Sequence, residues 1–221
     1  RFCCVWMGNI MKKWKEILAV ILITGCLGGC SQFQAEHNAV KVKRDGSVQA
    51  AVIDTLDKSY YSEDELKQTI DDSVSAYNQS QEGDPIVVKK FNVTDGKAEL
   101  YMNYAASRDY QDFNNVTFYA GDLQGAYNQK YEFPDEFQKV ENGKVTGSVT
   151  RSDILSGLNY NVVICSEEMD IEVPGKILYV TTDAVVTGKK TATSISEERE
   201  KAAESETETA SESESTDGGA K

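Results

Sequence analysis

The sequence predicts an α+β fold: an antiparallel sheet built from hairpins, one main amphipathic helix and several shorter helices. Alternating apolar residues flank Asp-Gly or Asn-Gly at three places, which is a strong hairpin signal. One long segment carries apolar residues at helical spacing, as an amphipathic helix does. We find no repeating strand-helix-strand unit, and its absence from the sequence favours α+β over a doubly wound sheet.

Each hairpin is predicted from a turn between two alternating segments. The first is centred on Asp45-Gly46, the second on Asp95-Gly96 and the third on Asn142-Gly143. After the second turn, one face of the strand is expected to carry Ala98, Leu100, Met102 and Tyr104, and the other Lys97, Glu99, Tyr101 and Asn103. This alternation predicts a half-buried antiparallel sheet.

The main helix is predicted from Glu63 to Gln79. Ser62 can cap its N-terminus, and Glu65 can reach back to complete a capping box. Its apolar stripe is Leu66, Ile70, Val74 and Tyr77. Acidic residues in the first turn favour the positive end of the helix dipole.

Shorter elements are expected further along the chain. Ser107 is predicted to cap a short helix that carries Tyr110 and Phe113, and another helix is predicted after Gly121. Later strands are expected at 159–165, 169–173 and 176–180, with Cys165 in the core because a lone thiol among apolar residues is usually buried.

Charge divides the 221 residues into parts. The formal net charge of −13 combines +3 in residues 1–29, −10 in residues 30–194 and −6 in residues 195–221. An acidic body argues against a nucleic-acid partner, since phosphate neutralisation needs a cationic surface. Residues 39–194 are expected to form a single globular domain. Residues 195–221, rich in Ser, Thr and Glu, are expected to be a disordered tail.

Few residues in the sequence suggest catalysis or metal binding. His37 is the only histidine, and no phosphate-binding glycine loop or nucleophile elbow occurs. Acidic residues cluster at Glu167, Glu168, Asp170 and Glu172, but Asp170 and Glu172 alternate with apolar neighbours, as on the outer face of a strand. We therefore expect no catalytic residues, metal site or cofactor.

The N-terminal segment has the parts of a secretory signal. Met11 is followed by Lys12, Lys13 and Lys15, then by the apolar run 17–23 and small residues. The run is shorter than the roughly 20 residues that span a bilayer. Residues 1–10 are expected to precede the true start at Met11, with Met7 as the alternative, so that Cys3 and Cys4 have no function.

The end of this segment resembles the lipobox of bacterial membrane lipoproteins. The resemblance is carried by Leu27-Gly28-Gly29-Cys30, and Ile23-Thr24-Gly25-Cys26 matches the same pattern. It covers about the first 30 residues and implies a diacylglyceryl group in thioether linkage on Cys30, or alternatively Cys26. Two acyl chains make a stable anchor where one is marginal. Residues 30–38 are then expected to be a short tether.

The body, especially residues 58–66, is similar to small uncharacterised lipoproteins of anaerobic Gram-positive bacteria. That likeness implies no activity or catalytic residue. Our leading hypothesis is a lipid-anchored domain on the extracytoplasmic face of the cell membrane, non-enzymatic, that interacts with a protein or the envelope. The alternative is a small ligand- or glycan-binding module that uses Tyr60, Tyr61 and Tyr101. A third hypothesis is an enzyme built on paired carboxylates.

Overall fold

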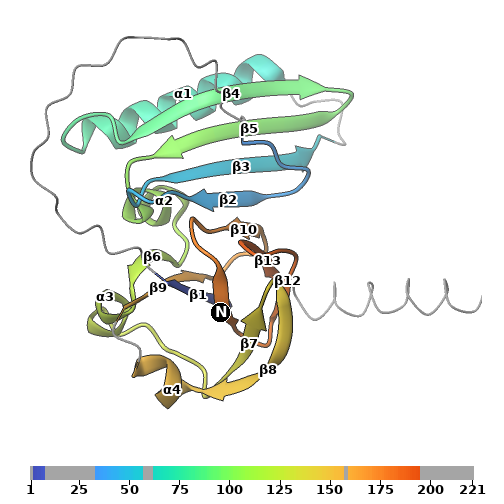
Figure 1. Ribbon diagram of the computed structural model, residues 1–221. Helices are drawn as coiled ribbons and strands as arrows, with labels where there is room; N and C mark the ends of the chain where they lie inside the picture. Colours follow the sequence, from blue (N-terminus) through green and yellow to red (C-terminus); the bar gives the residue numbers. More distant parts are fainter. Residues whose placement is uncertain (1, 8–32, 57–61, 157–158, 195–221) are drawn as a thin grey trace, which may run out of the picture.

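The computed structural model describes residues 2–7, 33–56, 62–156 and 159–194, and it confirms the α+β class. Within these residues the chain forms two sheets and four helices (Figure 1). The helices are α1 (Glu63–Gln79), α2 (Ser107–Asn114), α3 (Leu123–Asn128) and α4 (Arg151–Leu155). The predicted disordered tail and the residues 8–32 lie outside the described residues.

The seven-stranded sheet contains two of the predicted hairpins. Its order is β12 (Ala184–Val186), β13 (Thr191–Ser194), β10 (Asp170–Glu172), β2 (Ala39–Val42), β3 (Val48–Thr55), β5 (Lys97–Tyr104) and β4 (Ile86–Thr94). All of its pairs are antiparallel except β10 with β2. In Figure 1, α1 runs along β4 at one edge of this sheet.

The six-stranded sheet is antiparallel throughout. Its order is β6 (Phe118–Asp122), β9 (Tyr160–Cys165), β1 (Phe2–Met7), β11 (Ile177–Val180), β7 (Glu136–Glu141) and β8 (Lys144–Thr150). The third predicted hairpin, β7 with β8, forms one edge. Strand β1 lies in the middle, between β9 and β11.

The position of β1 differs from the boundaries expected from the sequence. We placed residues 1–10 outside the folded domain, whereas the structure places residues 2–7 in a central strand and buries Cys3 and Cys4 there. The physical reason is that four consecutive apolar side chains, residues 3–6, fit a strand that is covered on both faces. The sequence reasoning had assigned them by their place before Met11.

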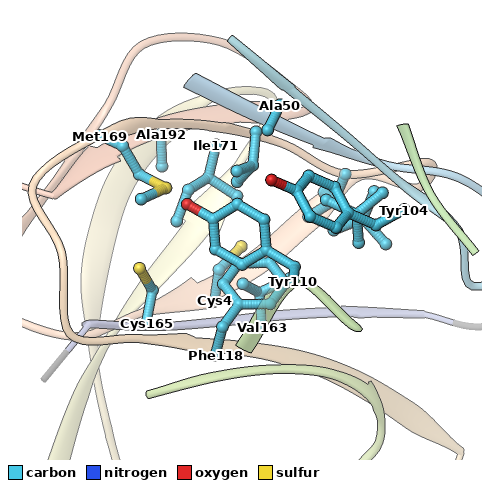
Figure 2. Close-up of a cluster of buried hydrophobic side chains, with 14 of the residues drawn as sticks. Cys4, Ala50, Tyr104, Tyr110, Phe118, Val163, Cys165, Met169, Ile171 and Ala192 are labelled. Carbon is cyan, nitrogen blue, oxygen red and sulfur yellow. The ribbon is translucent and has the colours of Figure 1, made fainter. Parts of the chain in front are cut away.

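Two clusters of buried side chains make up the core. The first lies between the two sheets and includes Val40, Met102, Tyr104, Phe118 and Val163; Figure 2 shows the last three closing around Tyr110 of α2. The second lies on the other face of the six-stranded sheet, where α3 and α4 cover it, and includes Phe137 and Ile154. The six-stranded sheet is therefore the middle layer of the molecule.

Local signals place the main helix as predicted. It spans Glu63–Gln79, and Ser62 Oγ accepts a hydrogen bond from the Glu65 backbone N–H at 3.3 Å. All three hairpin turns are confirmed, with positive φ at Gly46, Gly96 and Gly143. Such values suit glycine because it has no Cβ to clash.

One predicted cap is wrong. Ser107 is the first residue of α2, not its cap: Ala106 occupies that position and its backbone N–H donates to Asp109 Oδ2 at 2.9 Å. The Ser107 hydroxyl donates instead to the carbonyl of Ala120, 3.3 Å away. A long-range contact with β6 thus replaces the local cap that the sequence suggested.

Candidate functional site

The candidate site lies on the outer face of the seven-stranded sheet, where the alternation of β5 places Tyr101. Ala98, Met102 and Tyr104 are buried, while Glu99 and Tyr101 are half-buried on the opposite face, as predicted. Across the strands, Tyr101 is paired with Ala51 of β3 and Lys90 of β4, next to an irregularity in β4.

Residues 33–38, predicted to be a tether, lie against this face. Phe33 packs edge-on against the Tyr101 ring, with 6.2 Å between ring centroids. The Ala35 backbone N–H donates to the Tyr101 hydroxyl at 3.3 Å, and Asn38 Oδ1 accepts from the Ile53 N–H at 2.8 Å. These contacts hold the segment against the sheet. They are favourable because the aromatic ring of Phe33 is partly removed from water and the strand N–H of Ile53 gains a hydrogen-bond acceptor.

A cation lies over the Tyr101 ring. Lys90 Nζ lies 5.4 Å from the centre of the ring, within the range of a cation–π contact. The same Nζ donates to Glu99 Oε2 at 2.6 Å. This hydrogen bond raises the pKa of Lys90 and lowers the pKa of Glu99, so both groups remain charged.

A groove of about 550 Å³ opens over these residues. Its lining residues are Phe33, Gln34, Ala35, Glu36, Lys90, Lys97, Glu99 and Tyr101. A second groove of about 610 Å³ shares Glu36 and Lys97 with the first. We refer to the two together as the outer groove. It combines one aromatic pair with lysine and carboxylate groups, which suits recognition of a polar surface or ligand.

The second part of the outer groove is acidic. Its carboxylates are Glu36, Asp54, Glu167, Glu168 and Asp170, and it also contains His37. Only Asp170 is half-buried, and the other carboxylates are exposed to water. Asp170 also accepts from Thr193 Oγ1 at 2.5 Å. Asp170 and Glu172 lie on β10 beside the buried Ile171, as the alternation predicted.

The buried thiols are a separate feature of the core. Cys3, Cys4 and Cys165 are buried and form no disulfide among the described residues. Burial raises the pKa of Cys165 to about 11 and that of Cys3 to about 12. A thiol that stays protonated is a poor nucleophile. These cysteines therefore act as small core residues, as predicted for Cys165.

Of the predicted site residues, the described part of the chain contains only Tyr101. Cys26, Cys30, Leu27, Gly28, Gly29, Tyr60 and Tyr61 lie outside the described residues. The sequence reasoning missed Phe33, which packs on the Tyr101 ring, and Lys90, which lies over it. Alternation in β5 placed Glu99 beside Tyr101, but Phe33 and Lys90 come from other segments, so only a known strand register reveals them.

The comparisons with known proteins add no family. The chain matches no protein-family model, no curated protein and no solved structure. Among residues 2–7, 33–56, 62–156 and 159–194, no helix has the length and hydropathy to cross a membrane.

Proposed function

We propose that the protein is a lipid-anchored lipoprotein of the extracytoplasmic face of the cell membrane, with a non-enzymatic domain that binds a protein or another envelope component. The proposal takes the Lys-rich start, the short apolar run and the Leu27–Cys30 lipobox from the sequence. The structural observation that supports it is the docking of Phe33 on Tyr101.

Phe33 limits the distance between the proposed lipid and the domain. It follows Cys30 by three residues, and three extended residues span about 10 Å. An acyl group on Cys30 would hold the outer groove close to the bilayer surface. The mature chain from Cys30 carries a net charge of −16, so an anionic membrane repels it. Attachment would therefore depend on the lipid.

The modification that the resemblance implies has two steps. In the first, Cys30 Sγ forms a thioether with the glyceryl carbon of a membrane phospholipid, and the phosphate headgroup leaves with the thiol proton. In the second, a peptidase uses water to hydrolyse the Gly29–Cys30 peptide bond. Cys30 then becomes the N-terminal residue of the mature chain.

Metabolic labelling with a fatty acid tests the anchor. Cells that express the full chain should incorporate label into the protein, and Cys30→Ala should abolish the label. Cys26→Ala is the matched control and should leave it. Label lost only in Cys26→Ala would move the lipid to the other box, and a wild-type chain without label would rule out the anchor.

The outer groove supports a second candidate, a glycan-binding module. Tyr101 and Phe33 offer aromatic surface and Glu99 offers acceptors, as sugar sites do. However, Lys90 covers one face of the Tyr101 ring, and Tyr101 donates its hydroxyl to the chain's own Ala35 carbonyl at 3.4 Å. Binding of envelope glycans that Tyr101→Ala weakens tenfold, and Tyr127→Ala leaves unchanged, would favour this candidate; Tyr127 is 59% exposed.

A further inference from the structure

We propose that the protein associates with a second copy of itself head to tail, through opposite charges at the two ends of the seven-stranded sheet. The basic end of one copy docks into the acidic part of the outer groove of the next. This inference goes beyond the proposed function and does not depend on the lipid anchor, because both surfaces consist of described residues.

One end of the seven-stranded sheet is basic. Its loops follow β2 and β10 and precede β13, three strands that are neighbours in the sheet (Figure 1). The β7–β8 turn of the other sheet lies beside them, since atoms of Gly188 and Lys189 are 3.0 Å from where a Cβ on Gly143 would stand. The cationic residues of these loops are Lys43, Arg44, Lys144, Lys176, Lys189 and Lys190. We refer to these six residues as the basic end.

Backbone hydrogen bonds hold two of these loops against each other. The Ile177 N–H donates to the Lys189 carbonyl at 2.9 Å, and the Val173 N–H donates to the Lys190 carbonyl at 2.9 Å. Lys176 directly precedes Ile177, so it lies beside Lys189. The fold itself therefore gathers these lysines, and no ordering of the loops is needed when a partner binds.

The cations of the basic end form no ion pair within the described part of the chain. Five of the six are exposed, and Lys43 is half-buried. Three carboxylates lie on the adjoining strands and turns, and each has a partner of its own: Asp45 with Ser47, Glu172 with Lys41, and Glu141 with Lys139. Like charges gathered in this way repel one another, so an anionic surface is their favourable partner.

The carboxylates of the outer groove lie at the opposite end of the same sheet. Glu36 precedes β2, Glu167 and Glu168 precede β10, and Asp54 lies near the end of β3, which runs antiparallel to β2. The four residues of β2 separate the two ends by about 13 Å. Exposed charges farther apart than the Debye length of about 8 Å are largely screened at physiological salt. The two ends of one copy therefore do not neutralise each other.

The acidic part of the outer groove has the charge that the basic end needs. It is a groove of about 610 Å³ that carries five carboxylates. Among the described residues, none of these five pairs with a lysine or arginine. The lysine that lines the groove, Lys97, has Glu99 as its partner at 4.0 Å. The groove is thus an acidic hollow without counter-charges.

The β12–β13 turn has a shape that suits this groove. The N–H groups of Thr187 and Gly188 both donate to the Thr191 carbonyl at 3.1 Å, which makes the turn tight. A tight turn that carries Lys189 and Lys190 can enter the groove and bring ammonium groups to its carboxylates. Complementary charges of this kind steer association and fix the orientation of the partners.

The contact uses a different surface on each copy. Each copy therefore keeps one free end of each charge, and association continues into a ring or a filament. The acidic segment 195–221 of the same chain, with a net charge of −6, is the competing occupant of the basic end. Crosslinking distinguishes it from a second copy.

Charge reversal at each end tests the inference on the full chain, purified in a non-ionic detergent. Lys189→Glu with Lys190→Glu reverses the basic end, and Glu167→Lys with Glu168→Lys reverses the acidic end. These four side chains are exposed, so the substitutions should leave the fold intact. Sedimentation velocity measures association at low and at high salt.

We expect association of the unmodified chain to weaken about tenfold when salt rises from about 50 to about 500 mM. Each reversed variant alone should associate about tenfold more weakly at low salt. An equal mixture of the two variants should restore association, because the intact acidic end of one meets the intact basic end of the other. A mixture that stays dissociated overturns the proposal.

The matched control is Lys67→Glu with Lys89→Glu. It changes the net charge by as much as the basic-end variant, but the two lysines lie on α1 and β4, away from both ends. It should associate like the unmodified chain, and an equal loss in this control would overturn the proposal. Association that is the same in all variants and at all salt concentrations would also overturn it and would point to the apolar run 17–23.

Carbodiimide crosslinking identifies the occupant, because this reagent joins an amine to a carboxylate that is in contact with it. In a mixture of isotope-labelled and unlabelled chains, we expect crosslinks between Lys189 or Lys190 of one copy and Glu167 or Glu168 of the other. Crosslinks from these lysines to residues 195–221 in their place would overturn the proposal in favour of the tail.

The anchor and this interface can fail separately. Cys30→Ala should leave association unchanged, since neither end includes Cys30. A chain without fatty-acid label would overturn the anchor and leave the association result standing, whereas loss of association would overturn the interface and leave the label intact.

Discussion

The two sheets differ in how far apart along the chain their paired strands lie. The seven-stranded sheet contains three hairpins, β2 with β3, β4 with β5 and β12 with β13, and one pair of distant strands, β10 with β2. The centre of the six-stranded sheet joins segments from opposite ends of the chain, such as Cys3 and Thr181, which are 178 positions apart. Forming a hairpin loses little loop-closure entropy because its two strands are close in the chain. Pairing distant strands loses more, and burial of apolar side chains must offset that loss.

The largest expected effect is on stability and comes from a substitution in the core beside the six-stranded sheet. Phe137 of β7 is fully buried in the second cluster, so Phe137→Ala should lower the free energy of unfolding by about 3–5 kcal/mol. The control is Val145→Ala on the partner strand β8, where Val145 is 47% exposed; a change within about 0.5 kcal/mol is expected. Urea denaturation measures both. Equal effects would show that packing under α3 and α4 contributes little.

The next prediction concerns how stability falls at alkaline pH, where the thiol of Cys165 loses its proton more easily in the unfolded state than in the folded state. Burial raises the pKa of Cys165 from 9.0 to about 11, so the folded state keeps a proton that the unfolded state loses. Its contribution to stability is complete below pH 9 and is lost as the pH rises to 11, at most about 3 kcal/mol. Cys165→Ala should therefore flatten the fall of stability over this range, measured by denaturation at each pH. Parallel curves for the two proteins would contradict this.

Substitution of two turn glycines distinguishes the cost of backbone strain from the cost of a steric clash with a distant segment. Gly143, at φ +81°, has atoms of Gly188 and Lys189 3.0 Å from where a Cβ would stand, while Gly46, at φ +85°, has open space around it. Gly46→Ala should cost about 1 kcal/mol through backbone strain. Gly143→Ala should cost about twice that. Thermal unfolding of the two variants measures the difference in stability. A smaller loss at Gly143 than at Gly46 would show that the loop at Gly188 and Lys189 moves away from the added Cβ at little cost.

The smallest effect is expected in the outer groove. Phe33→Ala removes one aromatic pair, worth about 1 kcal/mol. Because the aromatic contact joins Phe33 to Tyr101, the loss should vanish in the background of Tyr101→Leu. A double-mutant cycle by urea denaturation measures this coupling. Full additivity would show that the segment 33–38 is held by other contacts.

Local sequence patterns correctly predicted the helices and hairpins that are stabilised by residues within the element itself. Ser62 and the apolar stripe predicted α1, and the three turns predicted their hairpins. Strands β6, β12 and β13 and helix α4 were not predicted. The three strands are short segments that depend on packing, whereas α4 begins with a local signal that was missed, the capping box formed by Thr150 and Asp153. Tyr101 was assigned to the correct face because period two is a property of the strand itself.

The sequence alone determined the α+β class, the main helix, the hairpins and the outward face of β5, because these depend on contacts between near neighbours. The tertiary structure decided two further features. It brought Phe33 and Lys90 to Tyr101, and it placed Phe2–Met7 between β9 and β11. Both depend on register between distant strands, which burial of whole side-chain clusters sets and no local pattern encodes.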